Sequence, residues 1–460
     1  MESITDGSLA VGGGSERHHG SVTPSAQSFG TVSPAASPQR SFRMRAERAL
    51  GIARHGDFAR FWAAQATSTI GSQFTAVALP LLAAVSLGAS PMAVGVLAAA
   101  AGLPHLLFGL FAGAWVDRLR RRPVMIAADV GRAALLATIP LAAWFGALRI
   151  EQLIAVAFLA ETLTVFFDIA YLAYLPGLVS REHLIEANSR LEATASGAQV
   201  IGPALGGTLV RVLGAPVAML VDASSYLVSA GFLGRIRMPE VAPERHGPET
   251  SMRTEIGLGL RTVWMSSVLR ALALSSTVMN LGGFLFLSIY VLYMTRDLGL
   301  GADAVGLVFA AGGVGALLGS MTAGPARSRW GVGPVLLGSQ ILFGLFGMFV
   351  PFAVLFPRYA LPLVVAAELL QWVMVLVYSI NAVSLRQAIT PDRLLGRVNG
   401  TMRFIVWGSR PIASLLGGYL GSRVGLPATL VVGAFGMLLA FVPLLVSPIP
   451  RLREIAMAGR

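Results

Sequence analysis

The stretch Gly88-Ala-Ser-Pro-Met-Ala-Val-Gly95 has a second copy 211 residues later, Gly299-Leu-Gly-Ala-Asp-Ala-Val-Gly306. The same offset relates nine of the 16 glycines between residues 58 and 237 to another glycine, where chance would give about two. The other pairs are Gly71 with Gly282, Gly102 with Gly313, Gly113 with Gly324, Gly197 with Gly408, Gly206 with Gly417, Gly207 with Gly418, and Gly214 with Gly425. A gapless repeat of this length indicates two copies of one large module.

The high apolar content of the chain indicates that it lies in a membrane. Hydrophobic residues make up 55% of the sequence and charged residues 13%, and the mean hydropathy is +0.70. A helix needs ~20 apolar residues to cross a bilayer, and twelve segments qualify: 58–86, 91–116, 124–146, 151–175, 188–213, 216–237, 267–294, 302–326, 333–356, 361–387, 398–422 and 426–447. We therefore predict an all-α polytopic membrane protein with 12 transmembrane helices in two pseudo-symmetric six-helix bundles, a construction typical of secondary transporters.

The absence of two residue types, Lys and Cys, excludes several kinds of site chemistry. All 35 basic residues are Arg, and the chain has no Cys. Without Lys there is no Walker A loop and no Schiff-base amine, and without Cys there are no disulfides or thiolate metal sites. The six histidines, which are His18, His19, His55, His105, His183 and His246, do not have metal-ligand spacing. We expect no metal, no cofactor and no enzymatic activity.

The net charge of +12 follows the predicted topology. If the N-terminus is inside, the segments on the cytoplasmic side hold 25 Arg from Arg40 onward, and the external segments hold five, namely Arg149, Arg211, Arg296, Arg358 and Arg423. This asymmetry is the positive-inside rule, so the charge is a topology signal and predicts no nucleic-acid partner. We expect a multi-pass protein of a bacterial cytoplasmic membrane with both termini in the cytoplasm.

The remaining segments set the predicted boundaries. Residues 1–57 are rich in Ser, Gly and Pro without an apolar face, and we expect a disordered cytoplasmic tail without a signal peptide. The first bundle is 58–237 and the second 267–448. Between them, 238–266 is a cytoplasmic linker, in which 255–264 is typical of a short interfacial helix. A cytoplasmic tail, 449–460, closes the chain.

A loop after the second predicted span identifies a family. Its sequence is Gly113-Ala-Trp-Val-Asp117-Arg118-Leu-Arg120-Arg121-Arg122-Pro123. It resembles the signature loop of the major facilitator superfamily, Gly-x-x-x-Asp-Arg-x-Gly-Arg-Arg, and it matches at Gly113, Asp117, Arg118, Arg121 and Arg122. It departs at Trp115, where Leu is usual, and at Arg120, where the family has Gly. The resemblance implies a loop that locks the outward-facing state; the alternative is a plain positive-inside anchor.

The fifth predicted span carries a second motif, Gly202-Pro203-Ala-Leu-Gly206-Gly207. It is similar to the Gly-Pro-x-x-Gly-Gly motif of the antiporter branches of the superfamily, which implies export; the alternative is helix packing without functional bias. Weaker pieces recur in order in the drug:proton antiporter-like branch that includes the enterobactin exporter and macrolide efflux proteins. They are Phe61-Trp62, Gly71, Ala78-Leu79-Pro80, Asp129-x-x-Arg132, Phe166-Phe167-Asp168, Leu175-Pro176, Asn188 and Val221-Asp222.

Ionisable residues inside the spans are candidates for energy coupling. Each costs ~2.5–3.5 kcal/mol at mid-helix, so a functional role is the default hypothesis. Glu161 lies near the middle of the fourth span and Asp168 two turns further on the same face. A carboxylate held away from water takes up a proton more readily, so we predict that Glu161, Asp168 or Glu368 carries the proton. Satisfied structural pairs are the alternative, and Asp129 with Arg132 is expected to be such an internal ion pair.

Polar and aromatic residues on the spans predict a cavity between the bundles. The candidates are Gln65, Thr69, Gln199, Asn280, Gln371, Trp372, Trp407 and Arg410. Helix–helix hydrogen bonding is the alternative for these residues. A cavity with carboxylates, Arg and aromatic rings is suited to a bulky amphipathic molecule.

The function expected from these features is secondary active export of a drug, an antibiotic or a siderophore-like natural product. Antiport of protons by alternating access would drive it, with the proton gradient as the energy source. The expected partners are the bilayer, the small-molecule substrate and protons, and the expected state is a monomer. The alternatives are proton-coupled nutrient uptake and a membrane scaffold or sensor that transports nothing.

Overall fold

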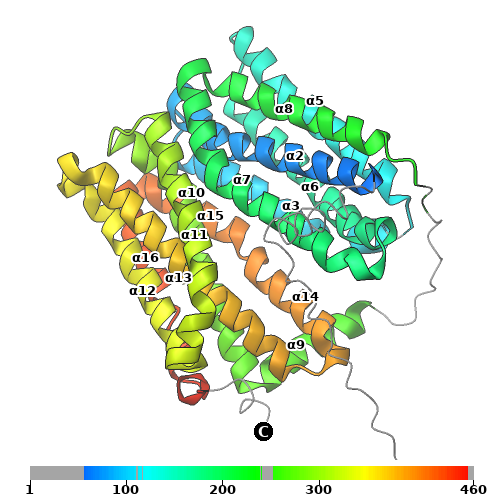
Figure 1. Cartoon of the computed structure of the whole chain (residues 1–460). Coiled ribbons are helices and arrows are strands. Elements are labelled where there is room, and N and C mark those ends of the chain that lie inside the picture. The colour runs from blue at the N-terminus through cyan, green and yellow to red at the C-terminus, as the bar shows by residue number, and fades with distance from the viewer. Residues whose placement is uncertain (1–55, 110–111, 117, 239, 241–251, 454–460) are drawn as a thin grey trace, which may run out of the picture. The chain divides into compact units, whose positions relative to one another are not determined.

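The structure is a computed structural model that describes residues 56–109, 112–116, 118–238, 240 and 252–453 (Figure 1). Regular structure in these ranges is helical throughout. The helices before the linker are α2 (Gly56–Leu81), continued by a π-helical turn (Leu82–Ser86), α3 (Pro91–Phe108), α4 (Ala112–Val116), α5 (Arg121–Trp144), α6 (Ile150–Leu178), α7 (Leu184–Leu213) and α8 (Ala215–Gly234). We call these the N-terminal half.

The helices after the linker form the C-terminal half. They are α10 (Ser267–Arg296), α11 (Ala302–Trp330), α12 (Val332–Phe352), α13 (Ala360–Ile389), α14 (Asp392–Gly408), α15 (Arg410–Val424), α16 (Leu426–Leu439) and α17 (Val442–Leu445). Ahead of them, α9 (Met252–Met265) covers the predicted interfacial helix; its position on the inner leaflet stays a prediction. The two predicted tails, apart from residues 56–57 and 449–453, lie outside the described residues, and so do residues 239 and 241–251 of the predicted linker.

Ten helical stretches in the described part of the chain are long and apolar enough to cross a membrane. The other two predicted spans correspond to α7 and to the pair α14–α15. Taken singly, α14 and α15 are short, with 17 and 15 residues. No stretch of α7 is as apolar as the ten counted spans. The predicted all-α polytopic fold is confirmed.

The eleventh predicted span, 398–422, is wrong as a single helix. The structure divides it at Ser409, where α14 ends and α15 begins with Arg410 and Pro411. Pro411 has no backbone N–H to donate to an upstream carbonyl, so the series of backbone hydrogen bonds of the helix is interrupted there. The break places Arg410 at the first turn of a new helix.

Two of the repeated glycine pairs, Gly95 with Gly306 and Gly207 with Gly418, lie where the two halves touch. A Cβ on Gly306 of α11 would lie 2.5 Å from the Pro203 oxygen and 2.8 Å from the Gly207 Cα, both in α7. At the matching crossing, a Cβ on Gly95 of α3 would lie 2.6 Å from the Gly418 Cα in α15. Since 95 matches 306 and 207 matches 418 in the repeat, α7–α11 and α3–α15 are the same contact made twice.

The repeat also sets the turn after each of these helices. Gly214 between α7 and α8 and Gly425 between α15 and α16 both have a φ of 86°. This left-handed conformation strains any residue with a Cβ, which explains why the repeat keeps glycine here.

Candidate functional site

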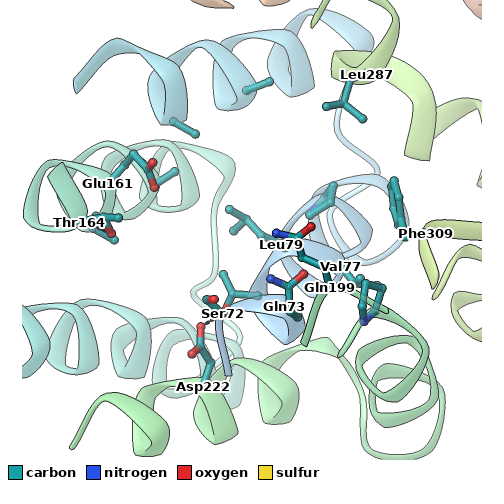
Figure 2. A pocket seen from close by; sticks show the side chains of 18 of the residues that line it. Ser72, Gln73, Val77, Leu79, Glu161, Thr164, Gln199, Asp222, Leu287 and Phe309 are labelled. Atoms are coloured by element: carbon teal, nitrogen blue, oxygen red, sulfur yellow. Dashed lines mark hydrogen bonds between the residues drawn. The ribbon is translucent and has the colours of Figure 1, made fainter. Parts of the chain in front are cut away.

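A cavity of about 960 Å³ lies between the two halves. Its wall includes residues of α2, α3, α5, α6, α7 and α8 from the N-terminal half and of α10, α11, α13, α14 and α15 from the C-terminal half. In the close-up, Glu161 and Asp222 lie on one side of the cavity, and Leu287 and Phe309 lie on the other (Figure 2). The two sides therefore differ in chemistry.

The N-terminal side contains most of the charge. Glu161 and Asp168 of α6, Asp222 of α8 and Arg132 of α5 all line the cavity. The carboxylate of Asp222 accepts hydrogen bonds from Thr75 (2.5 Å) and from Ser225 (3.1 Å). Asp222 is thus held by neutral donors, whereas Glu161 is half-buried and its Oε1 lies 3.5 Å from the Nδ1 of His105.

Arg132 is fixed by its surroundings. It donates to the carboxylate of the fully buried Asp129, one turn earlier on α5. Its guanidinium carbon lies 4.4 Å from the centre of the Phe167 ring and 4.3 Å from that of Tyr226. A guanidinium stacked between two rings in a desolvated site is a strong cation–π arrangement, so Arg132 is a rigid part of the cavity wall.

The C-terminal side is aromatic and apolar. Phe284, Leu287, Phe309, Trp372 and Trp407 line it. The rings of Phe284 and Trp407 have centroids 6.0 Å apart. Rigid rings supply large apolar contact area to a bound molecule at little cost in conformational entropy.

One cation of the C-terminal half, Arg410, packs against the N-terminal half. The stem of Arg410, at the start of α15, packs on Gly102 of α3, whose Cβ would lie 2.9 Å from the Arg410 Cγ. The Arg410 guanidinium carbon lies 5.7 Å from the centre of the Phe284 ring, and its charge acts on Glu161. In the repeat, Gln199 corresponds to Arg410, and Gln199 likewise packs against Gly313.

Glu368, the third predicted proton carrier, is placed behind the wall. Its carboxylate accepts from Trp372 Nε1 at 2.9 Å and from the Tyr290 hydroxyl at 3.1 Å, and only 5% of the residue is exposed. Trp372 lines the cavity and Glu368 does not. Glu161 and Asp168 are therefore better placed than Glu368 to meet a molecule in the cavity.

The structure brings most of the predicted cavity residues together. Those that line the cavity are Gln65, Thr69, Gln199, Trp372, Trp407 and Arg410. Asn280 instead donates to the Ser276 oxygen of its own helix at 2.8 Å, and Gln371 is buried against Gly347 of α12. Neither belongs to the lining.

The Gly-Pro-x-x-Gly-Gly motif is a packing element with two partners. Gly202 and Gly206 lie against Gln73 and Phe74 of α2, within the N-terminal half. Gly207 lies against α11 of the C-terminal half, where its Cβ would be 2.5 Å from the Ala302 oxygen. The motif thus fixes α7 to its own half and to the other half at once.

The signature loop is described in part. Asp117 lies outside the described residues, and so do the contacts of Gly113; Arg118 is exposed. The backbone N–H groups of Arg121 and Arg122 donate to the Glu240 carboxylate, and the Arg122 side chain donates to the Leu233 and Gly234 oxygens at the end of α8. These bonds tie the start of α5 to the end of α8. The predicted lock stays a prediction.

The sequence interpretation missed His105, which contacts the cavity residue Glu161, and two aromatic residues that line the cavity. His105 was judged only on metal-ligand spacing, although a histidine inside an apolar span is itself a signal. The sequence did not mark Phe284 and Phe309 as cavity residues, because an apolar residue on a span can face either the lipid or a cavity.

A polytopic helical protein with two repeated halves and a cavity between them belongs to the class of membrane carriers. A model of the family described as "Transmembrane secretion effector" matches residues 49–460. The chain belongs to this family of the major facilitator superfamily.

Curated relatives agree with this assignment. The multidrug efflux pump Tap of Mycolicibacterium fortuitum is 30% identical over 414 residues, which is 86% of this chain and 96% of Tap. The enterobactin exporter EntS of Shigella boydii serotype 18 is 29% identical over 290 residues, or 60% of this chain and 64% of EntS. The chain is thus a multi-pass membrane protein similar to bacterial exporters.

Solved transporters share the fold. A bacterial homologue of the iron transporter ferroportin superimposes with a TM-score of 0.70 at 17% identity, covering 85% of this chain and 98% of the transporter. The nucleoside transporter NupG gives 0.66 at 12% identity, covering 85% and 99%. At these identities the likeness shows the architecture.

Proposed function

We propose that this protein exports bulky amphipathic organic molecules across a bacterial cytoplasmic membrane, driven by protons that enter. The observation that carries the proposal is the two-sided cavity between the halves. Carboxylates on its N-terminal side provide a site for protons or for polar groups of a substrate, and aromatic rings on its C-terminal side bind an apolar body. The named activities of Tap and EntS, and the Gly202–Gly207 motif, support export.

The orientation of the described state follows from its contacts across the halves. Arg296 at the end of α10 donates to the Ala89 oxygen at 2.8 Å, and Arg211 at the end of α7 pairs with Asp303 at 2.6 Å. Both contacts join ends of spans that the positive-inside rule places outside. The external face is closed in this state, and the cavity accepts substrate from the cytoplasm or the inner leaflet.

Glu161 is the proposed proton carrier, with Asp168 as the second candidate. Glu161 borders the cavity from the N-terminal half and feels the charge of Arg410 from the other half. A change in the separation of these groups changes the proton affinity of the carboxylate, which is what coupling between protonation and conformation requires.

Proton-coupled uptake by the same fold is the competing function. It would use the same cavity and the same carboxylates, so the geometry alone does not separate the two directions. Export is favoured because relatives matched over 414 and 409 residues are named as efflux pumps.

A proteoliposome assay tests the proposal. Purified protein is reconstituted with a trapped pH-sensitive dye and an imposed pH gradient, and erythromycin, chloramphenicol, tetracycline and a catechol siderophore are added in turn. We expect at least one compound to accelerate collapse of the gradient, and we expect Glu161→Gln to reduce this flux about tenfold or more.

The matched control is Glu151→Gln, which changes an exposed glutamate at the start of the same helix. It should leave the flux unchanged. Equal loss in both variants, or undiminished flux in Glu161→Gln, would contradict the assignment of Glu161. If a compound accelerates collapse of the gradient only when it moves in the same direction as the protons, the function is uptake and not export.

A further inference from the structure

We propose that His105 is a positioning residue for Glu161. The imidazole shares the transported proton with the carboxylate, and groups of the opposite half control how it is shared. The inference rests on the proposed proton-coupled export and adds a residue that takes part in it.

The first observation is the unfinished contact between the two groups. The Nδ1 of His105 lies 3.5 Å from the Glu161 Oε1, slightly beyond the normal distance of ~2.7–3.2 Å between a hydrogen-bonded nitrogen and oxygen. This nitrogen is buried and has no hydrogen-bond partner. Because leaving a buried polar atom unpaired is costly, a small approach of α3 to α6 that closes the bond is favourable.

The second observation is the origin of the groups around the imidazole. Of the helices that pack on α3, α6 supplies Glu161, α15 supplies the Arg410 cation and α14 supplies the Arg403 cation. The Trp407 ring of α14 stacks on His105 with centroids 6.0 Å apart. Within the N-terminal half, His105 lies beside an acid; from the C-terminal half, the charges of two arginines act on it and one ring stacks on it.

The glycine before His105 makes this arrangement dependent on conformation. Gly102, one turn earlier on α3, leaves the space that the stem of Arg410 fills. The α3–α15 crossing is one of the contacts between the halves, so alternating access must change it. When the crossing changes, Arg410, Arg403 and Trp407 move relative to His105, whereas Glu161 moves together with it.

The proposed proton transfer takes place between Glu161 and His105. The O–H bond of protonated Glu161 breaks and an N–H bond forms at His105 Nδ1, so two neutral groups become a carboxylate and an imidazolium. The imidazolium then releases the proton to water. The nearby cations of the C-terminal half interact differently with the neutral pair and with the charged pair, which links the position of the proton to the position of the halves.

The test compares two transport modes in proteoliposomes with erythromycin, chloramphenicol and tetracycline. One mode is uphill movement driven by a pH gradient; the other is exchange of labelled for unlabelled compound without a gradient. His105→Gln keeps a polar group of similar size but cannot take up the proton. We expect it to lower the gradient-driven mode about tenfold and to leave exchange within about twofold.

His183→Gln, between α6 and α7, is the matched control and should preserve both modes. Equal reduction of both modes in His105→Gln would show a structural role and would overturn the inference, as would wild-type behaviour in both. Wild-type protein without gradient-driven transport would refute the proposed function instead.

A second measurement does not depend on a substrate. Phe145 after α5 and Phe356 after α12 are repeat partners and are 81% and 54% exposed. Because the chain has no Cys, spin labels on a Phe145→Cys/Phe356→Cys background report the distance between the halves alone. We expect the distance distribution to change with pH, and His105→Gln to alter this change. A wild-type distribution that ignores pH, or a His105→Gln distribution that shifts in the same way, would refute the inference.

Discussion

At the scale of single residues, the cavity depends on one cation held in a fixed place. Arg132 is paired with Asp129 and stacked between Phe167 and Tyr226. Asp129 is fully buried, so it needs this partner. Removing one member of a buried ion pair leaves an uncompensated charge, which costs about 3–5 kcal/mol.

We therefore expect Arg132→Gln to lower the thermal unfolding temperature of the purified protein strongly. Adding Asp129→Asn should recover part of the loss, because the double variant buries no unpaired charge. Arg120→Gln, which removes an exposed arginine, should have no such effect. The check is thermal unfolding of all four proteins in one detergent; a double variant no more stable than Arg132→Gln would contradict the pairing argument.

Residues of this kind were predictable in part. Asp129 and Arg132 stand out in the sequence because charge inside a span is rare, and so do Glu161 and Glu368. Their neighbours do not stand out: nothing local distinguishes Trp372, which faces the cavity, from Glu368, which lies behind it. That difference arises from how α13 is rotated in the packed bundle, and a single sequence does not determine it.

At the scale of helices, close approach between α7 and α11 depends on glycine. Gly207 and Gly306 meet with a Cβ-to-Cα distance of 2.8 Å, and backbone atoms cannot move aside as a flexible side chain can. The corresponding residues at the α3–α15 crossing are Gly95 and Gly418. A side chain at either crossing should hold the two halves apart.

We expect Gly207→Val to reduce gradient-driven transport about tenfold or more, since it disfavours the externally closed state. Gly197→Val is the matched control, because a Cβ on this glycine of the same helix meets no atom within 4 Å. Transport by both variants is measured in parallel at equal amounts of reconstituted protein. Normal transport by Gly207→Val would show that the crossing is not part of the cycle.

Helices were easier to predict than their interruptions. Spans of about 20 apolar residues are required by bilayer thickness, and a helix or helix pair is present at each of the twelve predicted positions. The break at Ser409 was missed, although Pro411 is visible in the sequence, because Pro203 in α7 is accommodated within a continuous helix. Proline alone does not decide between the two outcomes.

At the scale of the whole molecule, the repeat explains why the α7–α11 and α3–α15 crossings are alike. The side chains on the two sides of the cavity nevertheless differ. Glu161 and Trp372 occupy equivalent positions, as do Gln199 and Arg410. One half therefore presents carboxylates and the other presents rings and a cation, at places that the repeat makes geometrically alike. This asymmetry is the basis for proposing a substrate with one polar and one apolar part.

The contact between Arg211 and Asp303 allows a direct test of alternating access. It joins α7 to α11 at the predicted external face, and both side chains are exposed. An Arg211→Cys/Asp303→Cys pair can be oxidised to a disulfide without background, because the natural chain has no Cys. Each single variant is the control for loss of the ion pair.

The measurement is the proton flux that erythromycin, chloramphenicol or tetracycline triggers in proteoliposomes containing the Arg211→Cys/Asp303→Cys pair, before oxidation, after oxidation and after reduction. The account predicts that the disulfide stops the flux by holding the external face closed, and that reduction restores it. Flux that continues through the oxidised protein would contradict the central claim that the cavity between the halves transports its substrate by alternating access.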